Sequence, residues 1–333
     1  MPRETVVNKI VTKHDFNNVI PENKQLMYDF LDYLKAVDRS TNTIHQYEND
    51  LKIFFCYNLV YNDNKKFVEI TKRDFMKFQS HALNEWKWSS SRLRRVKACI
   101  SSLSNYIECI LDEEPEFTGY HSIIHKIESP ILKPRREKTI LSDNEINIVL
   151  DTLVKNEQYQ CACIFALAAF SGARRSELLR FKVHYFDDEN IMENAALYRT
   201  PEKIVTKGRG SSGKSLYKYT LLDFKKYYDL WINERRKRGI ESEMLFVNKN
   251  GLPLSKASLT DFAKDITDIL NKPFYFHSLR HQLCTRLFKL GLPADVIQEY
   301  FGWDSLDMTS IYNDNDVTDS FGKYFTKEGI KGV

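Results

Sequence analysis

The stretch from His277 to His281 reads His-Ser-Leu-Arg-His, and Gly302-Trp303 and then Tyr312 follow it. The surrounding sequence has helical periodicity, so His277 and Arg280, three residues apart, are expected on one helical face. A second arginine motif lies upstream, where residues 171–177 read Ser-Gly-Ala-Arg-Arg-Ser-Glu. The C-terminal part of the chain therefore carries two arginine motifs, a histidine, an indole N–H donor and a tyrosine.

These residue types are typical of chemistry on a phosphate group. Arginine is permanently charged, and its planar fork of donors fits phosphate oxygens. Tyrosine can act as a nucleophile that forms a covalent intermediate. Arg174, Arg280 and Tyr312, without any segment that has metal-ligand spacing, indicate phosphoryl transfer through a phosphotyrosyl intermediate. We expect no metal and no other cofactor.

The motifs also resemble those of the tyrosine recombinases of the phage-integrase type. Residues 172–177 are similar to the family motif Gly-x-Arg-x-Ser-Glu, residues 277–281 to His-x-Leu-Arg-His, and residues 302–303 to Gly-His/Trp. Tyr312 stands ten residues after Gly302, as the family tyrosine does. One motif would be a weak match, whereas three in this order are specific. They cover the C-terminal two thirds of the chain.

The resemblance implies a role for each charged residue. Arg174 and Arg280 would each bind one non-bridging oxygen of the scissile phosphate, where a preorganised donor contributes roughly 3 kcal/mol. Arg175 is the alternative to Arg174, but the Gly-x-Arg spacing favours Arg174. Glu177 would orient a guanidinium or a neighbouring histidine, and His277 would bond the phosphate or assist proton transfer.

Tyr312 is the expected nucleophile, chosen among 18 tyrosines by its distance from Gly302; Tyr300 and Tyr324 are the alternatives. Trp303 stands where most of the family has histidine. Its indole can donate to a phosphate oxygen or pack in the core, but it cannot accept a proton. His281 is expected to point away from His277 and to be a structural histidine.

The leaving 5′-oxygen needs an acid, and the family uses a lysine at the tip of a β-hairpin. Lys207, before the turn-rich residues 208–213, fits this role best. The stretch after Glu177 and the loop before residues 219–221 are longer than the family pattern. Lys203 and Lys214 therefore remain alternatives.

The chain is expected to be mainly α-helical with a small β-sheet, in two domains. Residues 1–20 read as a flexible arm, 21–112 as a helical domain, 113–138 as a polar, proline-punctuated linker and 139–333 as the catalytic domain. Caps at Ser40 and Ser89 precede helical apolar stripes, and another helix is expected to begin near Thr71. Residues 181–222 break the helical pattern and predict strands joined by a loop.

The N-terminal helical domain resembles the core-binding domain of the family, which grips DNA. Its fourth helix is expected to turn a cluster of basic residues outward near its start, namely Arg92, Arg94, Arg95 and Lys97. On charge alone a solvated face is equally consistent with this cluster, and the net charge of +4 does not identify a nucleic-acid binder.

The remaining composition is that of an intracellular globular protein. Hydrophobic residues make up 42% and charged residues 28%, so each domain can bury a core. Six cysteines show no C-x-x-C pair, and Cys161 and Cys163 read as small buried hydrophobes. The polar start and the shortness of the apolar runs argue against a signal peptide or a membrane span. The expected location is the cytoplasm of a bacterial or phage-infected cell, near the nucleoid.

Taken together, these features predict a site-specific recombinase that cleaves and rejoins DNA through a Holliday junction. By resemblance, a homotetramer would hold two double-stranded DNA sites, accessory DNA-bending proteins would be further partners, and the tail at 317–333 would pack on a neighbouring subunit. Two other functions compete: a type IB topoisomerase-like DNA-relaxing enzyme, and a DNA-binding protein without catalytic activity. The latter is disfavoured because every catalytic position is filled.

Overall fold

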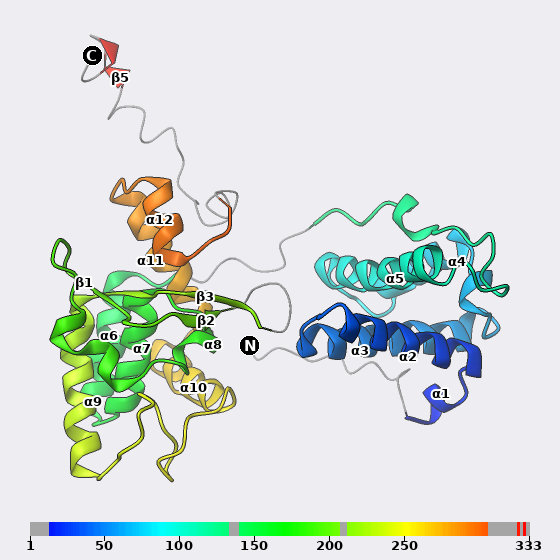
Figure 1. Cartoon of the computed structure of the whole chain (residues 1–333). Helices are drawn as coiled ribbons and strands as arrows, with labels where there is room; N and C mark the ends of the chain where they lie inside the picture. The colour runs from blue at the N-terminus through cyan, green and yellow to red at the C-terminus, as the bar shows by residue number, and fades with distance from the viewer. Residues whose placement is uncertain (1–12, 133–139, 207–211, 306–324, 327–328, 331–333) are drawn as a thin grey trace. The chain divides into compact units, whose positions relative to one another are not determined.

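The computed structural model describes residues 13–132, 140–206 and 212–305, together with the backbone of 325–326 and 329–330. The chain divides into an N-terminal unit that runs to Glu137 and a C-terminal unit that begins at Lys138. Helices dominate both units and the strands are short (Figure 1). The predicted class, mainly α with a small β component, is confirmed.

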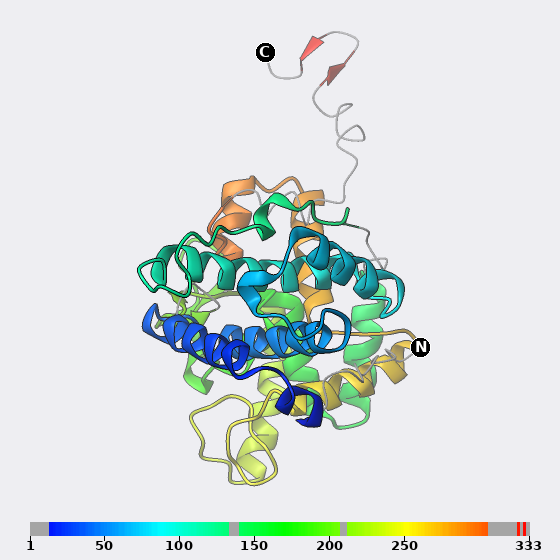
Figure 2. The same ribbon diagram turned by 90° about the vertical axis from the view of Figure 1, so that its right-hand side faces the viewer.

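The N-terminal unit is built from helices α1 (Lys13–Asn17), α2 (Pro21–Ala36), α3 (Thr41–Tyr61), α4 (Lys72–Asn84) and α5 (Ser90–Ile110). The predicted caps are present: the Ser40 and Ser89 hydroxyls accept from backbone N–H groups at the starts of α3 and α5. The helix expected to begin near Thr71 is α4, and Thr71 caps it. Helices α2 and α3 lie side by side, and α5 packs against both (Figures 1 and 2).

Two boundaries of this unit differ from the sequence prediction. Val19, expected in a flexible arm, is buried in the core of the helical unit, directly before α2. Ile124 and Ile127, expected in a linker, are buried in the same core around the short 3₁₀-helix η2 (Ile124–Lys126). Burying these apolar side chains stabilises the attachment of both segments, because apolar area is removed from water.

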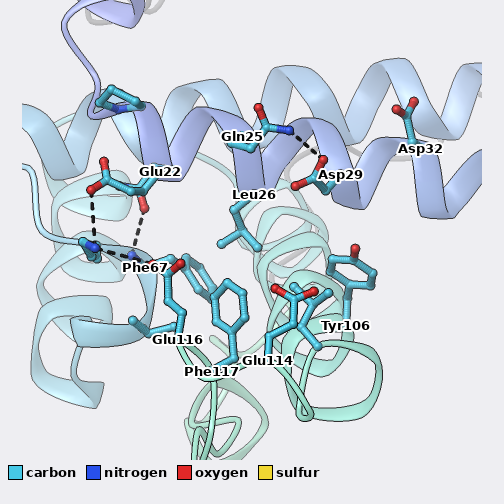
Figure 3. Close-up of a pocket in the computed structure, with 15 residues that line it drawn as sticks. Glu22, Gln25, Leu26, Asp29, Asp32, Phe67, Tyr106, Glu114, Glu116 and Phe117 are labelled. Carbon is cyan, nitrogen blue, oxygen red and sulfur yellow. Dashed lines mark hydrogen bonds and ion pairs between the residues drawn. The ribbon is translucent and has the colours of Figure 1, made fainter.

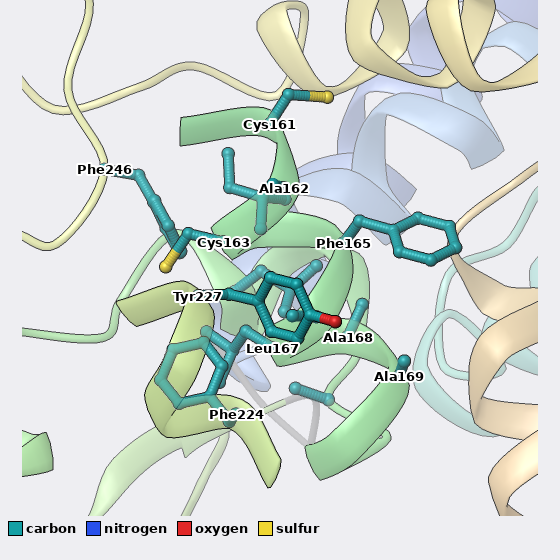
Figure 4. Packing of buried hydrophobic residues seen from close by; sticks show 14 of the residues in the cluster. Cys161, Ala162, Cys163, Phe165, Leu167, Ala168, Ala169, Phe224, Tyr227 and Phe246 are labelled. Atoms are coloured by element: carbon teal, nitrogen blue, oxygen red, sulfur yellow. The ribbon is translucent and has the colours of Figure 1, made fainter. Parts of the chain in front are cut away.

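The C-terminal unit is organised around α7 (Tyr159–Ser171). All residues from 161 to 169 are buried, and α7 contacts α6 (Asp143–Lys155), α9 (Lys225–Lys237) and α11 (His277–Lys289). Cys161 and Cys163 lie among the apolar side chains of this core, as predicted (Figure 4). Because α7 is apolar on every side, it is the central helix on which the others pack.

The predicted strands form two separate antiparallel pairs. Strand β1 (Leu197–Arg199) pairs with β4 (Tyr219–Leu221), and β2 (Ile204–Thr206) pairs with β3 (Lys214–Leu216). Two further strands, β5 (Phe325–Thr326) and β6 (Gly329–Ile330), pair near the C-terminus. The other elements of the unit are α8 (Arg175–Leu178), η3 (Val183–Phe186), η4 (Asp188–Asn190), η5 (Leu222–Phe224), α10 (Ser258–Leu270) and α12 (Ala294–Phe301).

Two glycines end helices where another element approaches closely. Gly172 follows α7 with φ of +59°, and Gly302 follows α12 with φ of +64°, a backbone conformation that favours glycine. A Cβ atom on Gly172 would overlap the Phe301 ring, and one on Gly302 would overlap the Leu216 side chain. Both glycines of the predicted motifs therefore bring helix ends against their neighbours.

Candidate active site

Arg174 is placed by the turn between α7 and α8. It is the residue before α8, and its backbone N–H donates to Glu177 Oε2 at 2.9 Å while its guanidinium Nη1 donates to Glu177 Oε1 at 3.0 Å. The Arg174 side chain is one quarter exposed, whereas Glu177 is fully buried. Glu177 therefore both caps the short helix and orients Arg174, in line with its predicted role. The alternative residue, Arg175, is exposed and bonds the Lys256 carbonyl instead.

Arg280 lies in the first turn of α11 and is almost completely buried, with 1% of its surface exposed. Its Nη1 donates to the Gly172 carbonyl at 2.7 Å and its Nη2 to the Phe301 carbonyl at 3.1 Å. These carbonyls stand at the C-terminal ends of α7 and α12, where unpaired oxygens and helix dipoles are negative. Two helix ends thus compensate the buried charge and hold the guanidinium in one orientation.

His277 is the first residue of α11. The surrounding protein desolvates its ring and lowers its pKa, and the positive charges of Arg280 and Arg174 act in the same direction. The lowered pKa favours the neutral imidazole, which can accept a proton. The structure thus gathers His277 and both predicted arginines in one site.

His281 does not point away from His277, contrary to the sequence prediction. The two rings lie 4.9 Å apart and nearly perpendicular, since residues four apart share a helical face. His281 is half-buried, and its ring supports that of His277.

Trp303 packs as the sequence allowed. It is buried, and its ring stacks on Phe301 with centroids 5.1 Å apart. The Arg280 guanidinium lies 4.7 Å from the Phe301 ring and 5.8 Å from that of Trp303. Trp303 thereby helps to form the aromatic wall that confines Arg280.

Two predicted residues, Lys207 and Tyr312, lie outside the described residues, as does Tyr324. Tyr300, the remaining candidate nucleophile, is half-buried, and its hydroxyl donates to the Phe170 carbonyl at 2.6 Å. Burial raises the pKa of Tyr300, which makes it a poor nucleophile.

Lys203 and Lys214, the candidate proton donors besides Lys207, both have partners near the β2–β3 pair. The ammonium of Lys203 faces the Tyr217 ring at 5.6 Å. The Lys214 ammonium pairs with the exposed Asp304 carboxylate. These contacts are to an aromatic ring and a surface carboxylate rather than to the arginines or the histidine of the site.

A lysine that the sequence motifs did not indicate completes the site. Lys218 Nζ lies 3.0 Å from Glu177 Oε2, and its side chain is 3% exposed. Desolvation lowers the pKa of Lys218 although the Glu177 charge opposes this shift. Burial would raise the pKa of Glu177, but Lys218 and Arg174 outweigh that effect, and the carboxyl remains ionised. Lys218 stands between two tyrosines before β4, and no local signal separates it from nearby lysines.

The basic cluster of α5 does not face outward as a whole. Lys97 is buried and donates to the Ile127 carbonyl and the Ser129 hydroxyl, so the prediction that it turns outward is wrong. The segment that includes Ile127 covers it, because that segment is folded on the helix.

The three arginines of the cluster have their own partners. Arg95 makes two hydrogen bonds to the buried Asp50 carboxylate, and Arg92 lies 4.1 Å from the Trp88 ring. Arg94 is exposed and bonds the Pro130 carbonyl. All three lie near the start of the helix; Arg94 and Arg95 are exposed, and Arg92 is half-buried.

A hollow of about 680 Å³ in the N-terminal unit is lined mainly by acidic side chains, in contrast to the basic cluster of α5 (Figure 3). It lies between α2 and the segment after α5, and its charged lining residues are Glu22, Asp29, Asp32, Lys66, Glu114 and Glu116. Lys66 is paired with both Glu22 and Glu116. Five carboxylates around one ammonium repel phosphate, so this hollow is unsuited to contact DNA.

None of the described helices combines the length with the apolar composition that a bilayer crossing requires. Within the same described residues, no group of three or more His, Cys, Asp or Glu side chains is arranged to hold a metal ion.

Comparisons with known proteins identify the family and the fold. The family model described as "Phage integrase family" matches residues 139–318. The SPbeta prophage-derived recombinase-like protein YomM of Bacillus subtilis (strain 168) is 28% identical over 296 residues, which cover 87% of this chain and 86% of that protein. Tyrosine recombinase XerD of Staphylococcus saprophyticus is 25% identical over 291 residues, 84% of this chain and 92% of that protein.

Solved structures show the same fold. A crystal structure of XerH site-specific recombinase bound to palindromic difH substrate, a post-cleavage complex, has a TM-score of 0.66 and 18% identity, and the match covers 90% of this chain and 94% of that one. The fold is that of a tyrosine-type recombinase. The chain belongs to the phage integrase family.

Proposed function

We propose that the protein is a site-specific DNA recombinase that cleaves and rejoins DNA strands through a 3′-phosphotyrosyl intermediate and a Holliday junction. The observation that carries this proposal is the convergence of Arg174, Arg280 and a neutral His277 at the junction of α7, α11 and α12. Two fixed cations suit a phosphodiester, whose transition state gains negative charge. The names of the relatives, recombinases and integrases, support the same function.

The proposed reaction uses Tyr312, His277 and Lys207. The Tyr312 oxygen attacks phosphorus, the bond from phosphorus to the 5′-oxygen breaks, and a 3′-phosphotyrosyl bond forms. His277 assists removal of the phenol proton, and Lys207 donates a proton to the 5′-oxygen. Rejoining reverses these steps with the 5′-hydroxyl of another strand. The phosphotyrosyl bond conserves the energy of the phosphodiester, so we expect no nucleotide cofactor.

An adduct assay in excess EDTA tests this proposal. The protein should form a covalent complex with a nicked suicide substrate in EDTA, because arginines rather than a metal would neutralise the phosphate. The readout is a gel shift that survives denaturation. Loss of cleavage in EDTA, with recovery on addition of magnesium, would point to a metal-dependent nuclease instead.

For the assembly, we propose a homotetramer on two double-stranded DNA sites, inside a bacterial or phage-infected cell and associated with the nucleoid. Accessory DNA-bending proteins are further candidate partners. A type IB topoisomerase-like enzyme would share the chemistry but act without a tetramer. The two activities separate in a relaxation assay on a supercoiled plasmid that lacks recombination sites.

The tail at 317–333, most of which lies outside the described residues, is the proposed connector between protomers. Its apolar residues Phe321, Tyr324 and Phe325 would be buried against a neighbour in a closed ring. Truncation before Val317 should spare binding of one protomer to one site but abolish the four-protomer complex and recombination. Native gels with single and paired sites measure both properties. A truncated protein that still forms the four-protomer complex would exclude the tail as connector.

For DNA binding, we propose that the arginines at the start of α5, Arg92, Arg94 and Arg95, contact phosphates. Arg94→Ala should reduce the slope of log affinity against log salt by about 0.9, since one phosphate contact is lost. Lys66→Ala is the matched control, because it removes one positive charge from the acidic hollow and should leave the slope unchanged. Equal slopes for both variants and the wild type would mean that Arg94 does not contact a DNA phosphate and is only a solvated surface residue.

A further inference from the structure

Glu177 is shared by two cations in the interior of the C-terminal unit. Its Oε1 accepts from Arg174 Nη1 at 3.0 Å, and its Oε2 lies 3.0 Å from Lys218 Nζ. Glu177 and Lys218 are both buried, so the interaction is only weakly screened by water. The three side chains form a chain of charges that ends at the partly exposed Arg174.

A count of charges shows what Lys218 adds. A buried carboxylate beside Arg174 alone would cancel most of its positive charge at the position where a phosphate binds. With Lys218 present, the three groups together carry a net charge of about +1, and Arg280 adds another. Glu177 can therefore orient Arg174 without neutralising it.

We propose that Lys218 is a positioning residue that balances the Glu177 charge, so that Arg174 offers its full positive charge to the scissile phosphate. This inference rests on the proposed recombinase function and assigns a role to a residue outside the sequence motifs. Lys218 acts through Glu177 and Arg174. It does not replace Lys207 as proton donor, because its ammonium is buried against the carboxylate.

The strand pairing explains how Lys218 reaches this position. Lys218 immediately precedes β4, and its backbone N–H donates to Thr200 Oγ1 at 3.1 Å. The Thr200 N–H donates to the Lys218 carbonyl at 2.9 Å, which continues the β1–β4 ladder. Strand β4 in turn contacts α7, the helix that leads into Arg174. The ladder therefore fixes the lysine backbone relative to Glu177.

The test compares a charged and an uncharged scissile phosphate. On the natural phosphodiester, Lys218→Met should slow single-turnover cleavage of a nicked suicide substrate by about 10- to 100-fold. On a methylphosphonate, in which a methyl group replaces one non-bridging oxygen, the phosphorus centre carries no negative charge. On this substrate Lys218→Met should slow cleavage by about threefold or less, because a neutral phosphorus centre interacts more weakly with the positive charge that Lys218 maintains. A lysine that only stabilises the fold would give the same defect on both substrates.

A double variant controls for folding. In Glu177→Gln/Lys218→Met the neutral amide leaves the Arg174 charge intact, as in the wild type. Its ratio of rates on the two substrates should stay within about threefold of the wild-type ratio, and thermal melting checks that it is folded. This variant keeps the inference testable if Lys218→Met is too unstable to assay.

Three outcomes are distinct. A wild-type protein that forms no adduct on the phosphodiester would refute the proposed function itself. A wild type that forms the adduct, with equal defects of Lys218→Met on both substrates, would overturn the role of Lys218 alone. A folded double variant whose rate ratio departs from the wild type by more than about tenfold would do the same.

Discussion

Tyr312→Phe should abolish the covalent protein–DNA adduct and recombination while leaving DNA affinity nearly unchanged. Phenylalanine keeps the ring but lacks the oxygen that would attack phosphorus, so no bond to the 3′-phosphate can form. Loss of a nucleophile lowers the rate by about 10⁴-fold or more, which brings adduct formation below detection. Denaturing gels measure the adduct on a nicked suicide substrate, and native gels measure affinity for the same DNA.

Tyr300→Phe is the matched control for this prediction. It also removes one phenol oxygen, but from a side chain that is half-buried and whose hydroxyl donates to the Phe170 carbonyl. This variant should retain the adduct, with only a modest loss of stability from the unpaired carbonyl. A normal adduct yield from Tyr312→Phe, or loss of the adduct in Tyr300→Phe, would contradict the assignment of Tyr312 as the nucleophile.

Features that depend on neighbours in sequence were predictable. The caps Ser40 and Ser89 act on backbone N–H groups within three residues, so the starts of α3 and α5 could be predicted correctly. The motif spacing predicts His277 and Arg280 on one helical face, and the structure brings both together with Arg174. Their roles in catalysis remain predictions.

Lys97 shows why the exposure of a charged residue was harder to predict. It follows Leu93 by four residues and therefore lies at the edge of the apolar stripe of α5. Whether such a lysine meets water depends on what covers the helix. The polar composition of the covering segment predicts a linker, although the side chains of Ile124 and Ile127 are buried in the helical core.

Lys218 could not be predicted for a related reason. Its partner Glu177 is far away in sequence, and the two meet only because β1 and β4 pair and β4 packs on α7. The sequence Tyr217-Lys218-Tyr219 alone is equally consistent with an exposed lysine at the edge of a strand. A buried ion pair of this kind follows from tertiary structure rather than from local pattern.

The boundaries of the N-terminal unit also depend on packing between segments that are distant in sequence. Val19 and η2 are joined to the helical core by a few apolar side chains separated by polar residues. Such sparse contacts leave no helical or strand period in the sequence, although each buried side chain contributes to stability. Composition therefore indicated an arm and a linker where the structure has packed segments.

Arg280→Lys should lower single-turnover cleavage by about 10³-fold even though the positive charge is kept. The guanidinium donates at the same time to the carbonyls that end α7 and α12, 2.7 and 3.1 Å away, and its planar fork fixes the direction of both bonds. A lysine ammonium is a point charge that cannot span both carbonyls and a phosphate oxygen in one fixed geometry. The loss of orientation should therefore appear in the cleavage rate more than in DNA affinity.

Arg286→Lys on the same helix is the control, because Arg286 is exposed and lies 3.9 Å from Asp143 at the protein surface. It should cleave at a rate close to that of the wild type. Arg280→Lys leaves one buried carbonyl without its donor, which costs about 1–3 kcal/mol of stability, so cleavage is compared at a temperature where thermal melts show both variants folded. If folded Arg280→Lys cleaves as fast as Arg286→Lys, the fork geometry of Arg280 is not required, and its role reduces to charge and packing between the two helix ends.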